Sequence, residues 1–596
     1  LLMLTIGLVL MGSKSEPRKQ NLNVLFIIAD DLNCDIGAYG NPIIKTPNID
    51  RLARNGVLFG NAHIQYPWCG PSRASFMTGL YPDQTKVKQL RINIREAIPE
   101  VVTIGQKYRE ERYHSVRIGK IFHYHNPGHI GTSGNDDNYT WDQTVNPYGR
   151  DKLEEYKINT LKPQRYGGTL SWLSAEGTDE EQTDGIGANE TIEFLDKFAK
   201  SRENFFLAFG LYRPHTPYVA PKKYYDMYDS NDMEIPEISD RYLMSIPEPA
   251  ARSIRPPSKI EQHDLDKDLA KTIKKAYYAT TSFVDAQVGR VLDKLKETGL
   301  DKNTIVVFTS DHGYHLGEHG HWMKKTLFDN GTRIPLIVSG PGINKNEKIM
   351  DAPVEMIDIY PTLMDLTGKK TPSFVSGKSF ASLLKDSSKR VRKSALTELI
   401  IGSKDEMVQG YSIKTNRYRL TQWGENGIHG YELYDDKFDK LEDFNHLDVI
   451  VQNDMSNIMD MIGHYYDELA NNIKEQVAKN AVKGYFNGHE VALLNYNDPV
   501  LTPMVSRQIM TNFMKRGINI DFVVTWGYEY TANAYRIGFS EFHSGKPPKH
   551  NLPELAKKVG IWGGTARQGG GSRYVGNAYV LKDKDFWSLF TRNKVV

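Results

Sequence analysis

The stretch NVLFIIADD (Asn23–Asp31) is an unbroken apolar run, rich in β-branched residues, that ends in two acids. Runs of this kind are typical of strands in a parallel sheet, because such strands are buried on both faces. Similar runs recur along the chain at NFFLAFGLYRPH (204–215), NTIVVFTSDHG (303–313) and RIPLIVSGPG (333–342). The first two of these follow amphipathic helical patterns, and strands that alternate with helices predict an α/β fold. We therefore expect a mainly parallel sheet between helices, over residues 22–375.

The composition is that of a globular protein, with 39% hydrophobic and 25% charged residues in a chain of 596. A chain of this length is long enough for more than one domain. The formal net charge of +2 excludes recruitment of nucleic acid or a membrane surface by bulk charge. It is compatible with a local basic pocket for a small anion.

The chain starts with LLMLTIGLVLMGSKSEP (1–17), a short apolar run followed by small and polar residues. This pattern is typical of a secretory signal peptide, and the run is too short to span a membrane. We interpret residues 1–21 as a leader and expect an exported protein that is periplasmic, secreted or lysosome-like. A disordered or membrane-tethered leader is the alternative. No later segment has the apolar length of a membrane span, so we expect no integral membrane segment.

The sequence pattern changes after about residue 394, where short alternating strands predict a small antiparallel sheet. We assign residues 376–475 to a C-terminal α+β subdomain, closed by a helix at about 455–479. Residues 476–596 form an additional module whose role the pattern does not indicate. Its glycine-rich stretch GGTARQGGGSR (563–573) indicates a structural loop or, as the alternative, a backbone nest for an anion.

Acids, imidazoles and a lysine follow several separate strands of the predicted sheet. In an open α/β sheet, ligands bind outside the carboxyl ends of the strands. A single aspartate after a strand is usually a cap or turn residue, but several such residues at the same edge predict a functional site. The residues are Asp30, Asp31, Lys120, His123, His215, Asp311 and His312.

The three aspartates at this edge offer hard oxygen donors, which suit Ca²⁺ or Mg²⁺. Clustered carboxylates without a cation would repel one another and raise their own pKa values, and a divalent ion would remove that conflict. The alternative is a zinc site in the histidine-rich stretch DHGYHLGEHGHW, although its spacing matches no structural zinc pattern. Its candidate ligands are His312, His315, His319 and His321.

Cys69, one of two cysteines with Cys34, lies in YPWCGPSRASFMTG (66–79). Pro71 suits the first turn of a helix, so Cys69 is predicted at a helix N-terminus, where free N–H groups favour anions. Arg73 follows one helical turn later and can reach the same end of the helix. The pattern therefore predicts an anion site that contains a nucleophile. A cysteine-dependent hydrolase with a thiolate of lowered pKa is the runner-up, and a disulfide with Cys34 is a further alternative.

The segment CGPSR followed by ASFMTG resembles the signature of the type I sulfatases. Further similarity lies in NVLFIIADDL, GKIFH, RPHTPY and DHGYHLGEHGHWMKK, and the last three of these are closest to the iduronate-2-sulfatase branch. The resemblance covers most of residues 22–375 and implies an alkaline-phosphatase-like α/β fold. It also implies that a sulfatase-maturing enzyme oxidises Cys69 to Cα-formylglycine, whose hydrated aldehyde supplies the attacking oxygen.

The resemblance further implies roles for individual residues. Ca²⁺, or less favourably Mg²⁺, would be bound by Asp30, Asp31, Asp311, His312 and formylglycine 69. Arg73 and Lys120 would hold the aldehyde hydrate and the sulfate, and His123 would take a proton from the second hydroxyl. His215 and Lys324 would face the bridging oxygen, with Lys325 as the alternative to Lys324. Asp311 would activate the attacking hydroxyl.

The expected reaction is hydrolysis of a sulfate monoester on a sulfated carbohydrate, such as a 2-O-sulfated uronate from a polysaccharide. A poor alkoxide leaving group needs a general acid, and the transferred group needs preorganised cations. A phosphomonoester or phosphodiester hydrolase of the same superfamily is one alternative, which the CGPSR segment disfavours. A glycan-binding protein with an inactive site is the other.

Overall fold

The computed structural model describes residues 21–238, 240–349, 351–402 and 406–435, together with the strands of a separate C-terminal sheet. The chain divides into two compact units, residues 1–447 and 448–596, which are described separately. The predicted leader and the predicted helix at 455–479 lie outside the described residues. Within the described residues, no helix combines the length and the apolar composition that crossing a membrane requires.

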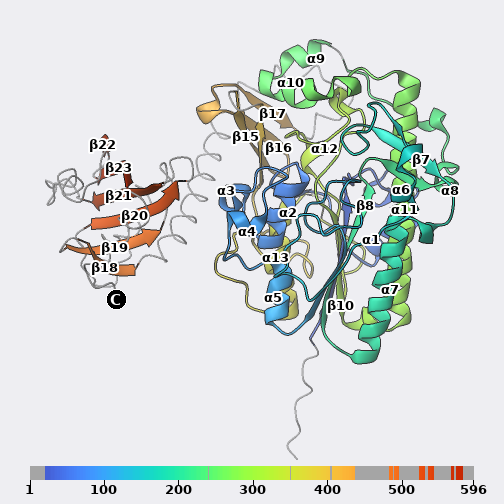
Figure 1. The fold of residues 1–596 in the computed structure, drawn as a ribbon, viewed down its shortest axis with the longest axis horizontal. Coiled ribbons are helices and arrows are strands. Elements are labelled where there is room, and N and C mark those ends of the chain that lie inside the picture. Colours follow the sequence, from blue (N-terminus) through green and yellow to red (C-terminus); the bar gives the residue numbers. More distant parts are fainter. Residues whose placement is uncertain are drawn as a thin grey trace, which may run out of the picture. The chain divides into compact units, whose positions relative to one another are not determined.

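A mixed sheet of eight strands forms the centre of the first unit, with the order β12-β2-β11-β10-β1-β8-β4-β5 (Figure 1). β1 lies inside this sheet and pairs in parallel with β10 and with β8, as its continuous apolar run predicts. The strands are β1 (Asn23–Asp30), β2 (Gly56–Phe59), β4 (His114–Gly119), β5 (Gln143–Val145), β8 (Phe205–Pro214), β10 (Thr304–Ser310), β11 (Leu336–Ser339) and β12 (Glu347–Ile349).

The strand predicted from RIPLIVSGPG is present as β11, but it runs antiparallel to both of its neighbours, β10 and β2. If β11 ran parallel to β10, the chain would first have to cross back to the amino ends of the strands. The chain between Ser310 and Leu336 contains only the short helical turns η7 (Glu318–Gly320) and α12 (Asp329–Thr332). It stays at the carboxyl edge of β10 and re-enters the sheet from that edge, which reverses the direction of β11.

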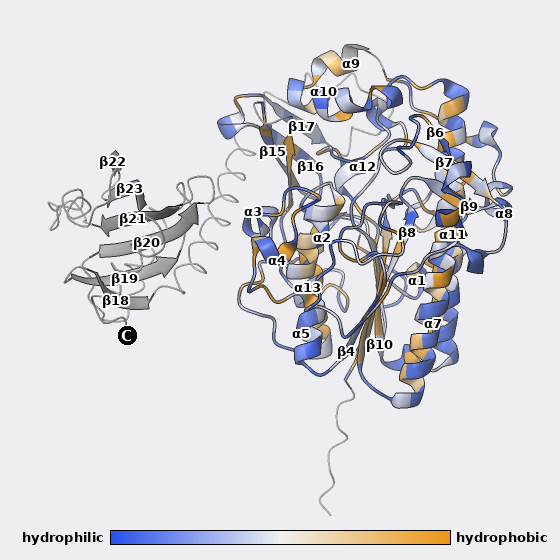
Figure 2. Ribbon diagram, in the orientation of Figure 1, coloured by the Kyte–Doolittle hydropathy of each residue, from blue (hydrophilic) through white to orange (hydrophobic). Residues whose placement is uncertain are grey.

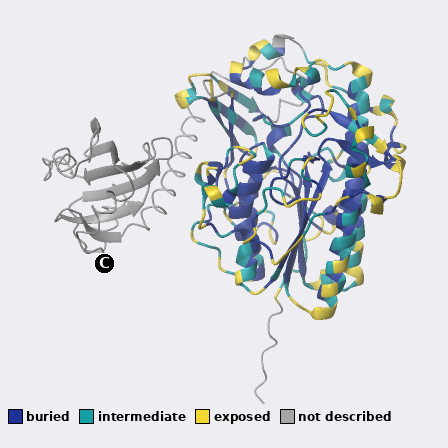
Figure 3. Cartoon of the chain, in the orientation of Figure 1, coloured by how far each residue is buried: buried dark blue, intermediate teal, exposed yellow. Residues whose placement is uncertain are grey.

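Two helical layers cover the sheet, and β1 contributes to both cores with a period of two. Leu25 and Ile27 pack in one cluster with residues of α1, α7 and α11, whereas Phe26 and Ile28 pack in another with residues of α2, α5 and α13. Figures 2 and 3 show the apolar, buried sheet between these layers. The helices are α1 (Pro47–Arg54), α2 (Cys69–Thr78), α5 (Ile104–Glu110), α7 (Thr183–Ser201), α11 (Lys267–Glu297) and α13 (Ile359–Thr367).

The predicted small antiparallel sheet is present in the first unit, with the order β14-β15-β16-β17. The second unit contains a six-stranded sheet with the order β18-β19-β20-β21-β23-β22. Its first four strands are β18 (Val482–Phe486), β19 (His489–Asn495), β20 (Phe522–Glu529) and β21 (Ala534–Phe542). Two described segments of its glycine-rich stretch form paired antiparallel strands, β22 (Thr565–Gly569) and the start of β23 (Ser572–Val580). The strands of the small sheet are β14 (Ala395–Ile401), β15 (Val408–Lys414), β16 (Tyr418–Trp423) and β17 (Tyr431–Asp435).

A buried ion-pair cluster joins the chain before β14 to the turn η8 (Met356–Asp358). Arg392 Nε donates to Asp358 Oδ2 at 2.7 Å, and Arg392 Nη2 lies 2.9 Å from Glu355 Oε2. Both carboxylates are fully buried, and burial raises the pKa of Glu355 to about 7 against the opposing charge of Arg392. Breaking a buried pair leaves uncompensated charge in a medium of low dielectric constant.

Replacing Arg392 with methionine is expected to lower the free energy of unfolding by about 3–5 kcal/mol, because two buried carboxyl groups lose their partner. Without Arg392 the pKa of Glu355 is expected to rise further above its unfolded value, so the deficit is expected to grow as the pH rises from 5 to 8. Urea unfolding at pH 5 and at pH 8 measures this difference in the free energy of unfolding between the variant and the native chain. Arg390→Met is the matched control, because Arg390 contacts only backbone carbonyls, and equal midpoints for the two variants would contradict the argument.

Candidate active site

The carboxyl ends of four strands meet at one edge of the large sheet, as the sequence pattern predicts. The last residue of β1 is Asp30, and Asp31 follows it with a left-handed φ of 65°. This conformation is strained for a residue with a side chain, and it turns the chain at the end of the strand. The other strand-end residues are Lys120 after β4, His215 after β8, and Asp311 and His312 after β10.

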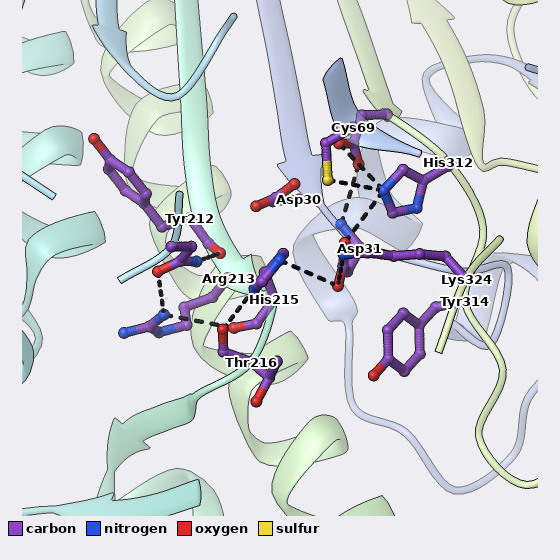
Figure 4. A network of polar contacts seen from close by, with 12 residues as sticks. Asp30, Asp31, Cys69, Tyr212, Arg213, His215, Thr216, His312, Tyr314 and Lys324 are labelled. Atoms are coloured by element: carbon purple, nitrogen blue, oxygen red, sulfur yellow. Dashed lines mark hydrogen bonds and ion pairs between the residues drawn. The ribbon is translucent and has the colours of Figure 1, made fainter. Parts of the chain in front are cut away.

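Helix α2 places Cys69 at this edge (Figure 4). The helix begins at Cys69 and ends before Gly79, which has a φ of 70°, and all ten of its residues are buried. The left-handed conformation at the C-cap favours glycine, which accounts for the final glycine of the motif. Cys69 Sγ lies 3.1 Å from His312 Nε2. The cysteine therefore faces the residues that follow β10.

The side chain of Arg73 connects three of these strand ends. Its Nε donates to Asp311 Oδ2 at 3.0 Å, and its Nη2 donates to Asp30 Oδ1 at 3.1 Å. Its Nη1 donates to the carbonyl oxygens of Lys120 and Ile121 at 2.9 and 2.8 Å. The guanidinium is fully buried, so these charge-assisted hydrogen bonds fix both carboxylates relative to α2.

The three aspartates are balanced by three buried cations, because Lys120 pairs with Asp30 and Lys324 with Asp31, in addition to the contacts of Arg73. Burial raises the pKa of Asp30, but the cations, Lys120 foremost, outweigh it and hold that pKa well below its ordinary value. Burial raises the pKa of Asp31 in spite of Lys324. Side-chain cations therefore provide part of the compensation that the sequence argument assigned to a divalent ion, while Asp30 and Asp311 still raise the pKa of Asp31.

The donor set between Cys69 and the carboxylates fits a cation. Ligand atoms of Asp30, Cys69, Asp311 and His312 all lie within 4.8 Å of one another. His312 Nδ1 donates to the carbonyl oxygen of Gly313 at 2.8 Å, which leaves the Nε2 lone pair directed into the site. Asp31 belongs to a second such group, with Cys69 and His215, and both of its carboxylate oxygens accept from Lys324 Nζ, at 2.6 and 2.7 Å.

The other histidines of the zinc alternative serve the packing of the loop. His315 Nε2 lies 2.7 Å from Thr326 Oγ1, and His321 Nε2 lies 2.9 Å from the carbonyl oxygen of Lys324. His319 bonds through Nδ1 to Tyr242 Oη. Burial lowers the pKa of all three, so they are neutral. Of the metal-capable groups found in the described part of the chain, neither contains one of these residues.

The electrostatics at Cys69 contradict the thiolate hypothesis. The helix N-terminus predicts a lowered thiol pKa, but burial raises the pKa of Cys69 well above its ordinary value. The charges of Asp30 and Asp311 add to this effect, and that of Lys324 opposes it. An unmodified Cys69 is therefore a neutral thiol, and the thiols of Cys69 and Cys34 are both free, without a disulfide.

A cavity of about 1050 Å³ lies at this edge of the sheet, and Asp31 and Cys69 form part of its floor. Cys69, His123, His215 and Lys324 all line it. His123 is 7% exposed, and neither of its ring nitrogens has a hydrogen-bond partner within the described structure. Burial and the charge of Lys120 lower its pKa well below the ordinary value. A neutral imidazole with two unused nitrogens can accept a proton from a group in the cavity.

The adjacent lysines Lys324 and Lys325 differ in their contacts. Lys324 is 6% exposed and reaches the carboxylate of Asp31 on the cavity floor. Lys325 has a left-handed φ of 70°, and its Nζ lies over the ring of Trp68, 4.1 Å from the centroid. Lys324 is therefore the lysine beside Cys69, whereas Lys325 lies on the cavity wall.

Hydrogen bonds from residues that the sequence patterns do not single out fix the chain just before His215. Asp184 in α7 accepts the backbone N–H groups of Tyr212 and Arg213 at 2.8 and 2.9 Å. Arg213 in turn donates to Asp151 Oδ2 at 2.6 Å. Burial raises the pKa of Asp184 to about 7. Nothing in the amphipathic pattern of α7 distinguishes this acid, although an aspartate on a buried helix face is itself an unusual signal.

The family model of the sulfatases matches residues 22–369, and a model of the C-terminal region of N-sulphoglucosamine sulphohydrolase matches residues 317–475. A sulfatase of Formosa agariphila is 34% identical over 457 residues, which cover 74% of this chain and 87% of the relative. Human iduronate 2-sulfatase is 31% identical over 539 residues, with coverages of 74% and 96%.

Solved structures with similar folds include the phosphonate monoester hydrolase from Silicibacter pomeroyi, with a TM-score of 0.62 and 22% identity, over 75% of this chain and 95% of that chain. A 2-O GAG sulfatase has a TM-score of 0.58 and 23% identity, with coverages of 75% and 92%. At these identities the similarity shows the alkaline-phosphatase-like fold alone. The family model, however, spans more than half of the 596 residues, and the first relatives are matched over most of their length. The chain belongs to the sulfatase family and is a sulfuric ester hydrolase.

Proposed function

We propose that Cys69 is converted to Cα-formylglycine and that the enzyme hydrolyses sulfate monoesters on a sulfated carbohydrate. The observation that supports this most directly is the position of Cys69, on the first turn of a buried helix, facing two carboxylates and His312. A buried thiol of raised pKa is a poor nucleophile in this position. The hydrated aldehyde would supply a hydroxyl that attacks sulfur and a second hydroxyl that allows sulfate to leave by elimination.

We also propose a divalent cation, Ca²⁺ in preference to Mg²⁺, held by Asp30, Asp311, His312 and residue 69. Asp31 is the remaining ligand candidate, provided that its carboxylate is shared with Lys324. The oxygen donors are hard ligands, and their irregular arrangement suits the flexible coordination of Ca²⁺ better than the strict octahedron of Mg²⁺. Such an ion would lower the pKa of a coordinated hydroxyl and stabilise negative charge on the sulfuryl oxygens.

The positions of the other residues at the site suggest their roles in charge stabilisation and proton transfer. Arg73 and Lys120 fix the carboxylates and, with Lys324, add positive charge next to the transferred group. His215 donates Nδ1–H to the carbonyl oxygen of Thr216, and burial lowers its pKa well below the ordinary value, so its Nε2 holds a lone pair at rest. Nε2 would give a proton to the leaving oxygen after the charge of a bound anionic ester has favoured the imidazolium form. His123 would accept the proton of the second hydroxyl, because both of its nitrogens are available.

The charge balance favours a sulfate monoester over a phosphate monoester. Three buried cations already neutralise three carboxylates, so a divalent ion would leave an excess of two positive charges. A singly charged sulfate ester and an ionised attacking hydroxyl would match that excess, whereas a phosphate monoester carries about −1.5 to −2 at pH 7 and would exceed it. Phosphonate or phosphodiester hydrolysis remains the second candidate, because the fold is shared with a phosphonate monoester hydrolase and those substrates also carry a single charge.

For the substrate we propose a 2-O-sulfated uronate or a similar polysaccharide-derived sugar. The human relative is named iduronate 2-sulfatase, and a structural neighbour is described as a 2-O GAG sulfatase. The apolar start of the chain supports export, which would bring the enzyme to such polymers, and a sulfatase-maturing enzyme is the implied partner. Sulfate release from defined sulfated disaccharides, measured beside phosphate diesters and phosphonate esters, tests the class of ester.

Mass spectrometry of the peptide around Cys69 is expected to show the aldehyde, or its hydrate, when a sulfatase-maturing enzyme is co-expressed. The Cys69→Ala variant is expected to lose activity by at least about a thousandfold, because the nucleophile is absent. Its melting temperature serves as the folding control. Full activity in a sample whose Cys69 is entirely unmodified would refute the formylglycine proposal.

Removal of divalent ions with a chelator is expected to lower the melting temperature and to abolish sulfate release, and Ca²⁺ is expected to restore both better than Mg²⁺. The variant His312→Gln should raise the Ca²⁺ concentration that gives half of the shift in melting temperature by about tenfold or more, because it removes a ligand and its oriented lone pair. His319→Gln is the control, since His319 packs outside the donor set. Ca²⁺ titrations that are identical for the native chain and His312→Gln would contradict the proposed ligand.

A further inference from the structure

The charged residues that line the cavity are not balanced. Each acid on the wall has a cationic partner that also lines the cavity: Lys324 for Asp31 at 2.6 Å, Lys152 for Glu155 at 2.6 Å, and Arg252 for Glu406 at 3.5 Å. Three further cations line the same wall, and none of them pairs with a carboxylate within the described residues. They are Arg165, Lys259 and Lys325.

Lys325 differs from the other two because its ammonium group lies on the ring of Trp68. Lys259 is partly buried, and burial lowers its pKa. Glu261 opposes this effect, whereas Lys324 and Arg165 add to it, so both cations act on Lys259 through space. A partly buried ammonium without a carboxylate partner is unfavourable unless an anion joins it.

The two segments that carry Arg165 and Lys259 are fixed to each other. The N–H of Thr169 bonds to the carbonyl oxygen of Arg165 at 3.0 Å, and Thr169 Oγ1 lies 3.1 Å from Gln262 Oε1. Gln262 belongs to the turn η5 (Pro257–Gln262), which also contains Lys259, and it is 4% exposed. A buried hydrogen bond therefore connects both loops at the cavity wall, which limits the ordering cost when a ligand binds there.

We propose that Lys259 and Arg165 form a second anion subsite, which binds a carboxylate or a further sulfate on the same saccharide whose sulfate ester is cleaved. The inference rests on the proposed function and extends it to a polyanionic substrate. A monoanionic ester needs only the cations around Cys69, and the additional unpaired charge on the wall is complementary to a second anionic group. Lys259 and Lys324 line the same cavity of about 1050 Å³, so the two anions would be borne by the same or adjacent sugar residues.

The test compares kcat/KM for an aryl sulfate without a second anionic group, a 2-O-sulfated uronate disaccharide, the same disaccharide with its carboxylate reduced to an alcohol, and a form with an additional sulfate. Lys259→Ala and Arg165→Ala are each expected to lower kcat/KM about tenfold or more for substrates with a second anion. The kcat/KM for the aryl sulfate should change less than about twofold, because this substrate has no group at the subsite. The reduced disaccharide, compared with the additionally sulfated form, identifies which anion the subsite binds.

Two further variants separate direct binding from a general effect of charge. Lys259→Arg keeps the cation and should retain most of the activity on the disaccharide. Lys162→Ala removes a nearby exposed lysine whose charge acts on Lys259 but which does not line the cavity, and it should change kcat/KM less than about twofold. Equal losses for Lys162→Ala and Lys259→Ala, or equal losses on the aryl sulfate and the disaccharide, would overturn the proposal.

Calorimetric titration of the disaccharide into Cys69→Ala keeps the inference separate from the proposed function. Additional substitution of Lys259 should weaken binding about tenfold or more, and higher salt should reduce the difference. If the native enzyme hydrolyses the aryl sulfate but the disaccharide binds equally with and without Lys259, the subsite is refuted and the proposed function stands. If no sulfate ester is hydrolysed, the proposed function fails, and the titration alone decides whether the subsite binds an anionic saccharide.

Discussion

The buried guanidinium of Arg73 is the interaction on which the architecture of the site depends. Its contacts reach Asp30 at the end of β1, Asp311 after β10 and the backbone that follows β4, so one side chain ties α2 to three strand ends. Without this buried guanidinium, Asp311 would lose its cationic partner and two carbonyl groups their donor, and Asp30 would keep only Lys120. The position of Cys69 relative to both carboxylates follows from this arrangement.

The residues of this site could be predicted from the sequence because the rules behind them are local or topological. The apolar run of β1 predicts a buried strand, and parallel strands deliver the residues after their carboxyl ends to one edge. Pro71 predicts that α2 begins near Cys69, and the structure confirms the start at that residue. These inferences need no knowledge of which side chains finally touch.

Other features depend on tertiary contacts that a pattern does not contain. The direction of β11 follows from the path of the loop that precedes it, and the different positions of Lys324 and Lys325 are seen only in their contacts with Asp31 and Trp68. The pKa of Cys69 was predicted with the wrong sign, because the helix N-terminus is a local effect, whereas burial and neighbouring carboxylates act more strongly. The support that Asp184 gives to the His215 loop likewise requires the folded chain.

The burial of α2 also limits when a modifying enzyme can reach Cys69. All ten residues of the helix are buried, and Arg73 has no exposed surface. An enzyme that recognises Cys69–Arg73 as an extended peptide can bind that segment only while it is still outside the folded domain. The proposed oxidation of Cys69 by such an enzyme would therefore have to precede the packing of α2 against the sheet, and a chain that folded earlier would keep its thiol. The rate of folding, relative to the encounter with the modifying enzyme, would determine the active fraction of the protein.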